Sequence, residues 1–382
     1  MKAVRSLAAN SPTRAIAREV LIRGPISRGE LARKLGLSAA SLTRLSRPLL
    51  EAGILQEGTD SQAGTVGRPT KPLDVRSDSH QFVGIKLTGD AASAVLADLR
   101  CRVTASATRP LVSHEVEDVV DAICAVVADL GPAAGVSGIG ISLGGKVGSP
   151  TGSGMVQRAP FLQWRDVPLG RLVQERTGLP VVLENDVVAL TVAEQWFGAG
   201  RGIPHFAVLT IGAGVGYGLV INDRVIAPPD AGLGLAGHFP LDAAGPLCLE
   251  SHRGCSTAML TMQGICAQVT AATGLPHHYE SVLQLAREDH PVALQVVESA
   301  GTALGTLIAA VANLTMVELV ILSGEGMDLA DVVPARVDAA VSIHRDPEAQ
   351  PIRLVREHTD FSQWARGAAA VVIQESIIGT LN

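Results

Sequence analysis

The 382-residue sequence lacks long apolar runs, a signal-peptide core and a cysteine framework. No apolar run reaches the length of about 18 residues that a membrane-spanning helix needs, and residues 1–20 alternate charged and short apolar pieces. The five cysteines are too irregularly spaced for a disulfide framework, so Cys101, Cys124 and Cys266 are expected to be reduced and buried. These absences predict a cytoplasmic protein, and the length predicts two or three domains.

Charge is distributed unevenly along the chain. Residues 1–76 contain thirteen Lys and Arg against six Asp and Glu, a net charge of +7, so the overall net charge of −6 leaves −13 for residues 77–382. This division favours contact of the basic segment with a polyanion, because phosphate neutralisation is the sequence-independent part of nucleic-acid affinity. An ordinary solvated surface would explain the charge alone equally well.

The basic segment contains the signals of three short helices. Residues 12–21 predict the first of them. Ser27, followed three residues later by Glu30, is a capping box that predicts a second helix, and Gly36 ends it. Ser38 predicts the start of a third helix with leucines at helical spacing. Two short helices joined by a glycine-containing turn are typical of a helix-turn-helix, whose second helix enters the major groove of DNA.

The third helix has a leucine-free face of small and basic residues, which suits close approach to base edges and phosphates. After it, residues 54–75 place two β-prone ends around a polar, glycine-rich middle, which predicts a wing. A Gly-Arg-Pro turn in that wing favours insertion of its arginine into an A·T-rich minor groove, although the tripeptide alone is usually just a turn. The residues predicted to bind DNA are Ala39, Ala40, Ser41, Thr43, Arg44, Arg47 and Arg68.

From about residue 80 the sequence predicts an α/β body. Residues 82–99 predict a strand, a turn and a second strand, as at the start of an actin-like or sugar-kinase-like domain. A later strand ends in Glu184-Asn185-Asp186, and the carboxyl ends of strands are where open α/β sheets place ligand chemistry. The glycine-rich hairpin 206–221 fits either a ligand that approaches the backbone or a close-packed turn. We predict a winged helix-turn-helix at residues 1–76 and a two-lobed, actin-like α/β body at residues 80–382.

Five segments together resemble the ROK family (repressor, open reading frame, kinase), in particular its sugar-responsive repressors of the N-acetylglucosamine and xylose repressor type. They are GRPTKPLDV, LENDVVALTVAEQWFGAG, LTIGAGVGYGLVI, AGHFPLDAAGPLCLESHRGC and LVILSGEG. The resemblance covers essentially the whole chain. It implies a transcriptional regulator that binds a double-stranded DNA operator, responds to a sugar or sugar derivative, and forms a homodimer or a homotetramer.

The chain departs from the kinase pattern of that family at the nucleotide loop. Where the resemblance calls for Asp-x-Gly-Gly-Thr, the matching run is Lys86-Leu87-Thr88-Gly89-Asp90. Asp186 matches the catalytic base of the family kinases. A base without a phosphoryl donor is only a binding group, because phosphoryl transfer depends on groups positioned around the nucleotide. We therefore predict no catalytic residue and no enzyme activity.

The sugar site that the resemblance implies is also incomplete. Leu235 and Thr257 replace two glutamates of the family pattern, which leaves Asn185, Asp186 and His238 as the predicted effector-binding residues. A site built to hydrogen-bond a polyol discriminates less when partners are missing. Three functions therefore stay open: a sugar-controlled regulator, a sugar kinase with an appended DNA-binding head, and a constitutive regulator that has lost its effector.

A further motif lies in residues 237–255, which contain two histidines and two of the five cysteines. The resemblance implies a structural zinc ion held there by one histidine and three cysteines. In this chain a carboxylate replaces the middle cysteine, and His252 is a nearby substitute. The predicted zinc ligands are His238, Cys248, Glu250 and Cys255, and a metal-free loop with buried thiols is the alternative.

Overall fold

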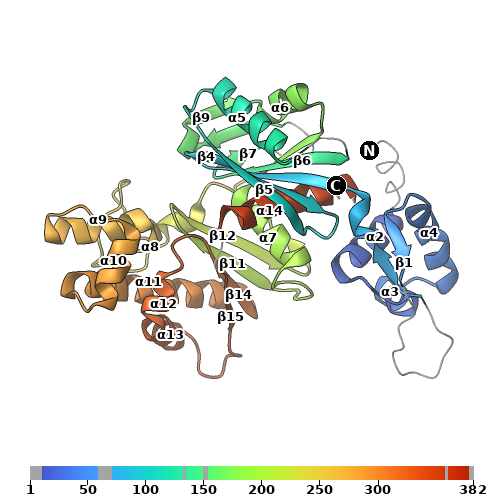
Figure 1. Cartoon of the computed structure of the whole chain (residues 1–382). Helices are drawn as coiled ribbons and strands as arrows, with labels where there is room; N and C mark the ends of the chain where they lie inside the picture. The colour runs from blue at the N-terminus through green and yellow to red at the C-terminus, as the bar shows by residue number, and fades with distance from the viewer. Residues whose placement is uncertain (1–10, 59–70, 132–134, 149–153, 358–359, 378–382) are drawn as a thin grey trace. The chain divides into compact units, whose positions relative to one another are not determined.

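The computed structural model describes residues 11–58, 71–131, 135–148, 154–357 and 360–377. The chain forms two compact units. Unit 1 contains residues 1–202 and 361–382, and unit 2 contains residues 203–360. Figure 1 shows the elements of both units and labels most of them. The predicted domain boundary between residues 76 and 80 lies within unit 1 and stays a prediction.

Unit 1 begins with the predicted winged helix-turn-helix, and we call residues 11–58 and 71–76 the head. Its elements are α2 (Ser11–Arg23), α3 (Arg28–Leu35), α4 (Ala39–Glu51), β1 (Leu55–Glu57) and β2 (Leu73–Val75), the two strands pairing antiparallel. The predicted caps are confirmed, because the hydroxyls of Ser27 and Ser38 accept the N–H groups of Glu30 and Ser41, each at 3.1 Å. The head has its own core of fully buried side chains, namely Ile16, Val20, Leu21, Leu31, Leu42, Leu49 and Leu73.

The main sheet of unit 1 has five strands in the order β10-β6-β3-β4-β5. The strands β10, β6 and β3 are parallel, whereas β3, β4 and β5 form an antiparallel meander. The bounds are β3 (Gln81–Leu87), β4 (Ala91–Asp98), β5 (Val103–Pro110), β6 (Val136–Leu143) and β10 (Val181–Asn185), and a smaller antiparallel sheet contains β7 (Lys146–Val147), β8 (Val156–Ala159) and β9 (Trp164–Val167).

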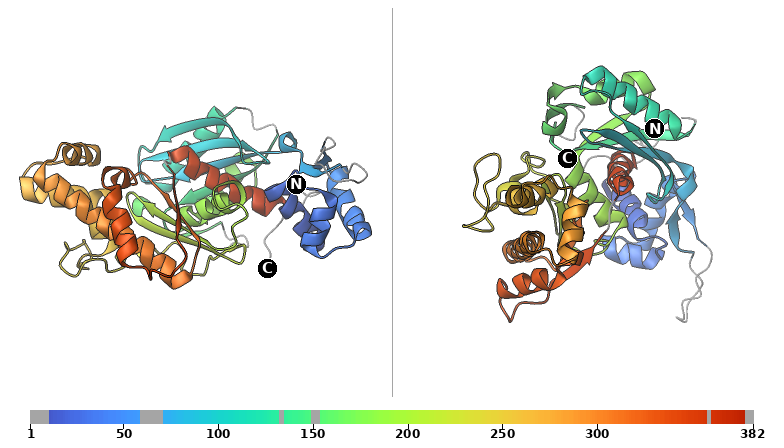
Figure 2. Two further views of the ribbon diagram at one scale, coloured as in Figure 1. Left: turned by 90° about the horizontal axis from the view of Figure 1, so that it is seen from below. Right: turned by 60° about the vertical axis from the view of Figure 1, so that its left-hand side comes forward.

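Helices cover both faces of this sheet. α5 (Val116–Asp129) and α6 (Leu169–Thr177) pack on one face, and α7 (Asp186–Phe197) and α14 (Phe361–Ile377) on the other (Figure 1). Both views of Figure 2 show α14, in red, against the sheet. The approach is so close that a Cβ atom on Gly84 would lie 2.0 Å from the Ala365 carbonyl oxygen. Glycine is therefore required at this point of the sheet.

Unit 2 repeats the strand plan of unit 1. Its sheet has the order β13-β12-β11-β14-β15, with β11, β12 and β13 in an antiparallel meander and β14 and β15 added parallel to β11. This duplicated strand plan follows the winged head in the sequence. It confirms the predicted fold class, a winged helix-turn-helix with a two-lobed, actin-like α/β body. The elements are β11 (Phe206–Ile211), β12 (Val215–Ile221), β13 (Arg224–Val225), α8 (Ser256–Leu260), α9 (Met262–Thr273), α10 (Tyr279–Arg287), α11 (Pro291–Thr315), β14 (Leu319–Ser323), α12 (Leu329–Val332), α13 (Pro334–Ile343) and β15 (Arg353–Arg356).

Helix α11 is the centre of the unit 2 core and contacts α8, α9, α10 and α13. Among the described residues it is the one helix long and apolar enough to cross a membrane by length and composition, and 56% of its most apolar stretch is buried inside unit 2. Burial of this kind is what a core helix of a folded domain requires.

Two elements are not evident from hydrophobic periodicity. Residues 256–273 form two helices, because Thr261 ends α8 and caps α9 by accepting the Gly264 N–H at 3.0 Å. Strand β5 has no apolar signature, because it is an edge strand and its side chains are largely exposed. Both features depend on hydrogen bonds that hydrophobic periodicity does not report.

Candidate functional site

Helix α4 presents the predicted DNA-binding face to solvent. Ala39, Ala40, Thr43, Arg44 and Arg47 are exposed, whereas Ser41 is half-buried and its hydroxyl accepts a hydrogen bond from that of Ser38 at 2.9 Å. Leu42 and Leu49 on the opposite side are buried in the head core. As predicted, the leucines lie on one side of α4 and the small and basic residues lie on the other.

Two arginines on this face differ in their partners. The Arg47 guanidinium donates to Glu51 at 2.7 Å, an exposed pair of small energetic value. Arg44 has no hydrogen-bond or ion-pair partner in the described part of the chain, so its guanidinium is available to a ligand. Arg68, the predicted minor-groove residue, lies outside the described residues.

The carboxyl ends of β3 and β10 bring together Lys86 and Asp186, which are 100 residues apart in the chain. They form an ion pair whose side chains are only 8% and 14% exposed. The Lys86 ammonium also lies 4.6 Å from the centroid of the Trp364 ring on α14, a cation–π contact. The signal that could have found this pair is the lysine that stands where the family pattern has an acid.

Asn185 holds the start of α7. Its side-chain oxygen accepts the N–H groups of Val187 and Val188 at 3.0 and 3.2 Å, and its amide nitrogen donates to the Gly145 carbonyl at 3.0 Å. The side chain is buried, so most of its hydrogen-bonding capacity serves the fold. Its role in effector binding stays a prediction.

Glu184 is a titratable group at the same strand end. Burial raises the pKa of its carboxyl to about 7, and the hydrogen bond from the Asn185 N–H at 2.8 Å opposes that rise. The carboxyl is therefore partly protonated near neutral pH, which makes this strand end sensitive to pH.

We predict that Glu184→Gln removes a pH-dependent loss of stability. The pKa of the folded state lies above the ordinary glutamate value of about 4.3, so the neutral carboxyl stabilises the fold fully at low pH and this contribution is lost as pH rises through about 7. Between pH 5 and pH 8 the wild type should lose up to about 3 kcal/mol relative to the variant. All three tryptophans lie in unit 1, so urea unfolding followed by tryptophan fluorescence measures this. Parallel pH profiles would contradict it.

The metal motif forms a compact cluster in unit 2. His238, Cys248 and His252 place ligand atoms within 4.8 Å of one another. The Nδ1 atom of His238 lies 3.8 Å from the Cys248 sulfur and 3.6 Å from the Cys255 sulfur. The Nδ1 atom of His252 lies 3.6 Å from the Cys248 sulfur. A tetrahedral zinc ion with ordinary Zn–S and Zn–N bonds sets sulfur and nitrogen ligands about 3.6 Å apart, so these three nitrogen–sulfur distances are compatible with zinc.

Glu250 lies beside the same histidine, and its predicted role as a metal ligand stays a prediction. Its carboxylate lies 2.8 Å from Nε2 of His238, on the ring nitrogen opposite the sulfur atoms. A carboxylate on the far nitrogen of a metal-binding histidine is a common outer partner that fixes the orientation of the ring. Both ring nitrogens of His238 thus have partners inside unit 2, and its predicted effector role stays a prediction.

The two thiols differ in their ionisation. For Cys248, burial raises the pKa, but hydrogen bonds from the backbone N–H groups of His252 and Glu250 outweigh burial and leave the pKa below its ordinary value. For Cys255, burial is the main cause of a raised pKa, and the neighbouring Cys248 sulfur adds to it. Zinc binds thiolates, so a metal ion would take up the Cys248 sulfur more readily at neutral pH.

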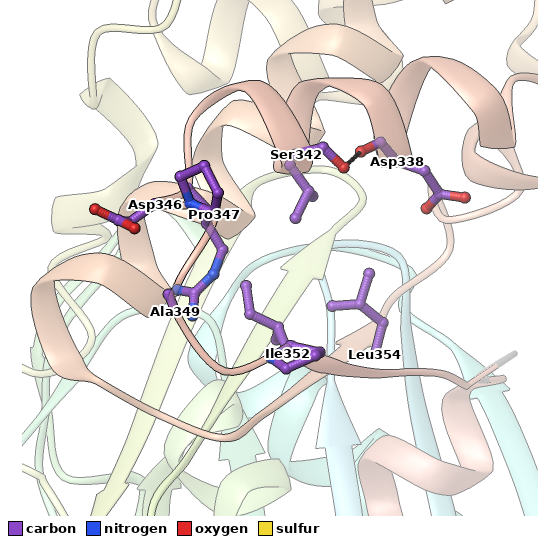
Figure 3. A pocket seen from close by; sticks show the side chains of 10 residues that line it. Asp338, Ser342, Asp346, Pro347, Ala349, Ile352 and Leu354 are labelled. Carbon is purple, nitrogen blue, oxygen red and sulfur yellow. Dashed lines mark hydrogen bonds between the residues drawn. The ribbon is translucent and has the colours of Figure 1, made fainter.

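Unit 2 also has an open hollow of about 520 Å³ between α13, β15 and the loop that joins them (Figure 3). Ser342, Ile352 and Leu354 line it together with charged and proline residues, and the Ser342 hydroxyl donates to the Asp338 carbonyl at 2.9 Å. None of the predicted site residues lines this hollow.

The chain is similar to known proteins over most of its length. The DNA-binding transcriptional repressor Mlc of Escherichia coli (strain K12) is 25% identical over 93% of this chain and 90% of its own. A putative xylose repressor of Caldicellulosiruptor sp. (strain Rt8B.4) is 25% identical over 83% of this chain and 84% of its own. A solved structure of a ROK family transcriptional regulator, a homolog of the E. coli MLC protein, has a TM-score of 0.79 at 26% identity and covers 96% of this chain and 98% of its own. Residues 82–375 match the ROK family, and the chain belongs to that family.

Proposed function

We propose that this protein is a cytoplasmic, sequence-specific transcriptional regulator, a repressor of carbohydrate-related genes. It binds an inverted-repeat, double-stranded DNA operator as a homodimer or homotetramer. The observation that carries the proposal is the exposed face of α4, the second helix of the helix-turn-helix, with small residues at its start and arginines after them. The similarity to repressors across both the head and the body supports it.

The chemistry of α4 suits the major groove. Ala39 and Ala40 are too small to hold the helix away from the base edges, and their methyl groups can contact thymine. Arg44 has a planar fork of donors that matches the two acceptors of guanine. The net charge of +7 in residues 1–76 adds attraction to phosphates whatever the sequence. Base reading and phosphate attraction thus come from the same segment.

We predict that Arg44→Ala weakens operator binding by about 1–3 kcal/mol, the usual value of a bidentate contact with a base, and relaxes preference at one base pair. Selection from genomic DNA with the full chain would supply the operator, and fluorescence anisotropy at fixed salt would measure the affinity. Arg171→Ala is the matched control, because Arg171 is an exposed arginine of α6 whose ion-pair partner among the described residues is Glu175, at 3.3 Å.

Two results would count against the proposal. A chain that enriches no sequence from genomic DNA is not a sequence-specific regulator. An Arg44→Ala variant with unchanged affinity and unchanged base preference would mean that α4 does not read the operator.

The nucleotide loop supports a non-enzymatic body. The backbone N–H groups of Asp90 and Ala91 donate to the Thr88 hydroxyl at 3.2 and 3.0 Å, so they do not point free toward a phosphate. The carboxylate that matches the kinase base is engaged by Lys86. A catalytic base must take the proton of a substrate hydroxyl, so Asp186 would first have to loosen its pairing with Lys86.

We propose Asn185, Asp186 and His238 as effector-binding residues, on the strength of the family resemblance. The effector is a sugar or a sugar derivative. Thermal-shift screening of neutral sugars, amino sugars and sugar phosphates separates a sensor from a constitutive regulator, because a ligand of the native state raises the unfolding midpoint. A flat response to the whole panel favours the constitutive alternative.

We propose further that the loop of residues 238–255 binds one structural zinc ion through His238, Cys248, His252 and Cys255. The ligand atoms of His238, Cys248 and His252 lie within 4.8 Å of one another, and the Cys255 sulfur lies 3.6 Å from Nδ1 of His238, which supports the proposal. Glu250, one of the ligands predicted from the sequence, is instead assigned to the outer position on His238. Four protein ligands close the coordination sphere, so the ion holds the loop and leaves no position for a catalytic water.

A further inference from the structure

Arg100, in the turn between β4 and β5 of unit 1, contacts the head. The Arg100 guanidinium donates to the carbonyl oxygens of Leu21 and Gly24, each at 2.8 Å, and to the Asp74 carboxylate. Its side chain is only 13% exposed. The acceptors come from two parts of the head, the end of α2 with the residue that follows it and the wing strand β2. The side chain of Arg100 thus forms hydrogen bonds with two parts of the head.

Hydrogen bonds and close packing restrain the residues around Arg100. The Asp98 carboxylate accepts the backbone N–H groups of Arg100 and Arg102 at 2.8 and 3.0 Å, which holds the turn in shape. A Cβ atom on Gly24 would lie 2.8 Å from the Asp74 carboxylate and 2.9 Å from the Arg100 guanidinium. Any larger residue at Gly24 would push the two partners apart.

Arg366 of α14 connects the same turn to α7, the helix that begins at the candidate effector residue Asp186. Arg366 of α14 donates to the Cys101 carbonyl at 3.0 Å and to the Phe197 carbonyl at the end of α7 at 3.2 Å. Helix α7 begins at Asp186, and α14 carries Trp364, on which Lys86 lies. Hydrogen bonds thus connect this turn both to the head and to α14, the helix whose Trp364 ring contacts Lys86.

We propose that Arg100 is a positioning residue for operator recognition: it fixes the orientation of the head on unit 1 and thereby sets the half-site spacing that the protein accepts. The inference rests on the proposed DNA-binding function. A planar guanidinium that bonds three acceptors restrains angles as well as distance. In a dimer, the separation of two reading helices must match the separation of two half-sites, so head orientation decides which spacing is bound.

The test compares the DNA-binding affinity of three full-length proteins: wild type, Arg100→Ala and the matched control Arg102→Ala. The duplexes carry two selected half-sites, and the distance between the half-sites is increased one base pair at a time. Arg102 belongs to the same turn and is exposed. A duplex with one half-site reports head binding alone. Wild type and Arg102→Ala should prefer one spacing by about tenfold or more, a usual size for coupling between sites. Arg100→Ala should lose that preference and keep its affinity for the single half-site.

Each other outcome is decisive. If Arg100→Ala keeps the spacing preference, the proposal is wrong. If the variant also loses affinity for the single half-site, Arg100 serves the fold of the head and the proposal is equally overturned. If wild type binds none of the duplexes and no half-site can be selected, the proposed DNA-binding function fails instead, and the two failures are distinguishable.

Discussion

Lys86→Met is expected to lower the free energy of unfolding of unit 1 by about 3 kcal/mol, because it leaves the Asp186 carboxylate in a nearly closed environment without its cation. Methionine keeps the length and apolar character of the lysine stem and retains contact with the Trp364 ring, so the loss reports charge more than volume. Urea unfolding followed by tryptophan fluorescence measures it, since Trp364 is adjacent to the change.

The reciprocal variant Asp186→Asn should be destabilised to a similar degree, because it leaves the Lys86 ammonium buried without its carboxylate partner. The double variant should recover most of either loss, since replacing a whole buried ion pair by neutral groups is often nearly neutral. A double variant as unstable as the sum of the two single variants would show that packing, not charge pairing, holds these side chains, and would remove one support for a non-enzymatic body.

His252→Ala is expected to abolish stoichiometric zinc, whereas Glu250→Gln should keep zinc with an affinity lowered by about 10–100-fold, the usual effect of losing an outer partner. The reason is geometric: His252 directs Nδ1 to the Cys248 sulfur, while Glu250 contacts the far nitrogen of His238. Metal content by mass spectrometry and competition with a chromophoric chelator measure the two variants.

Cys266→Ser is the control for this pair, because Cys266 lies in α9 outside the loop of residues 238–255. Zinc content should be unchanged in it. The opposite ranking, with zinc lost in Glu250→Gln and kept in His252→Ala, would return Glu250 to the ligand position that the sequence pattern assigns to it. Absence of metal from the wild type under all loading conditions would favour the metal-free loop.

Local signals predicted the parts of the fold that depend on local physics. Ser27 and Ser38 predict helix starts, because a hydroxyl can accept hydrogen bonds from the free N–H groups at a helix start. Both caps are present in the structure. Strand β14 coincides with the apolar run LVILS at residues 319–323. The position of Asn185 and Asp186 at a strand end also follows from the sequence, because the apolar run stops there.

The site chemistry was harder to predict because it depends on pairs that are distant in sequence. Lys86 meets Asp186 only because β3 and β10 both pair with β6 in parallel. No spacing rule connects residues 100 positions apart. In the metal loop, counting positions favours Glu250, whereas the turn at Ser251, with a φ of 65°, brings His252 beside the sulfur atoms. A sequence motif does not predict backbone geometry of this kind.

The placement of α14 has a consequence for how the protein is made. The sheet of unit 1 is complete once β10 has been synthesised, but the face that α14 covers stays open until residues 361–377 leave the ribosome. At the usual elongation rates of about 5–20 residues per second, this interval lasts on the order of 10–30 s. Unit 2 is continuous in sequence and can fold within that interval. Nascent chains that stop before residue 361 should therefore expose an apolar sheet face and be preferred substrates for chaperones and proteases.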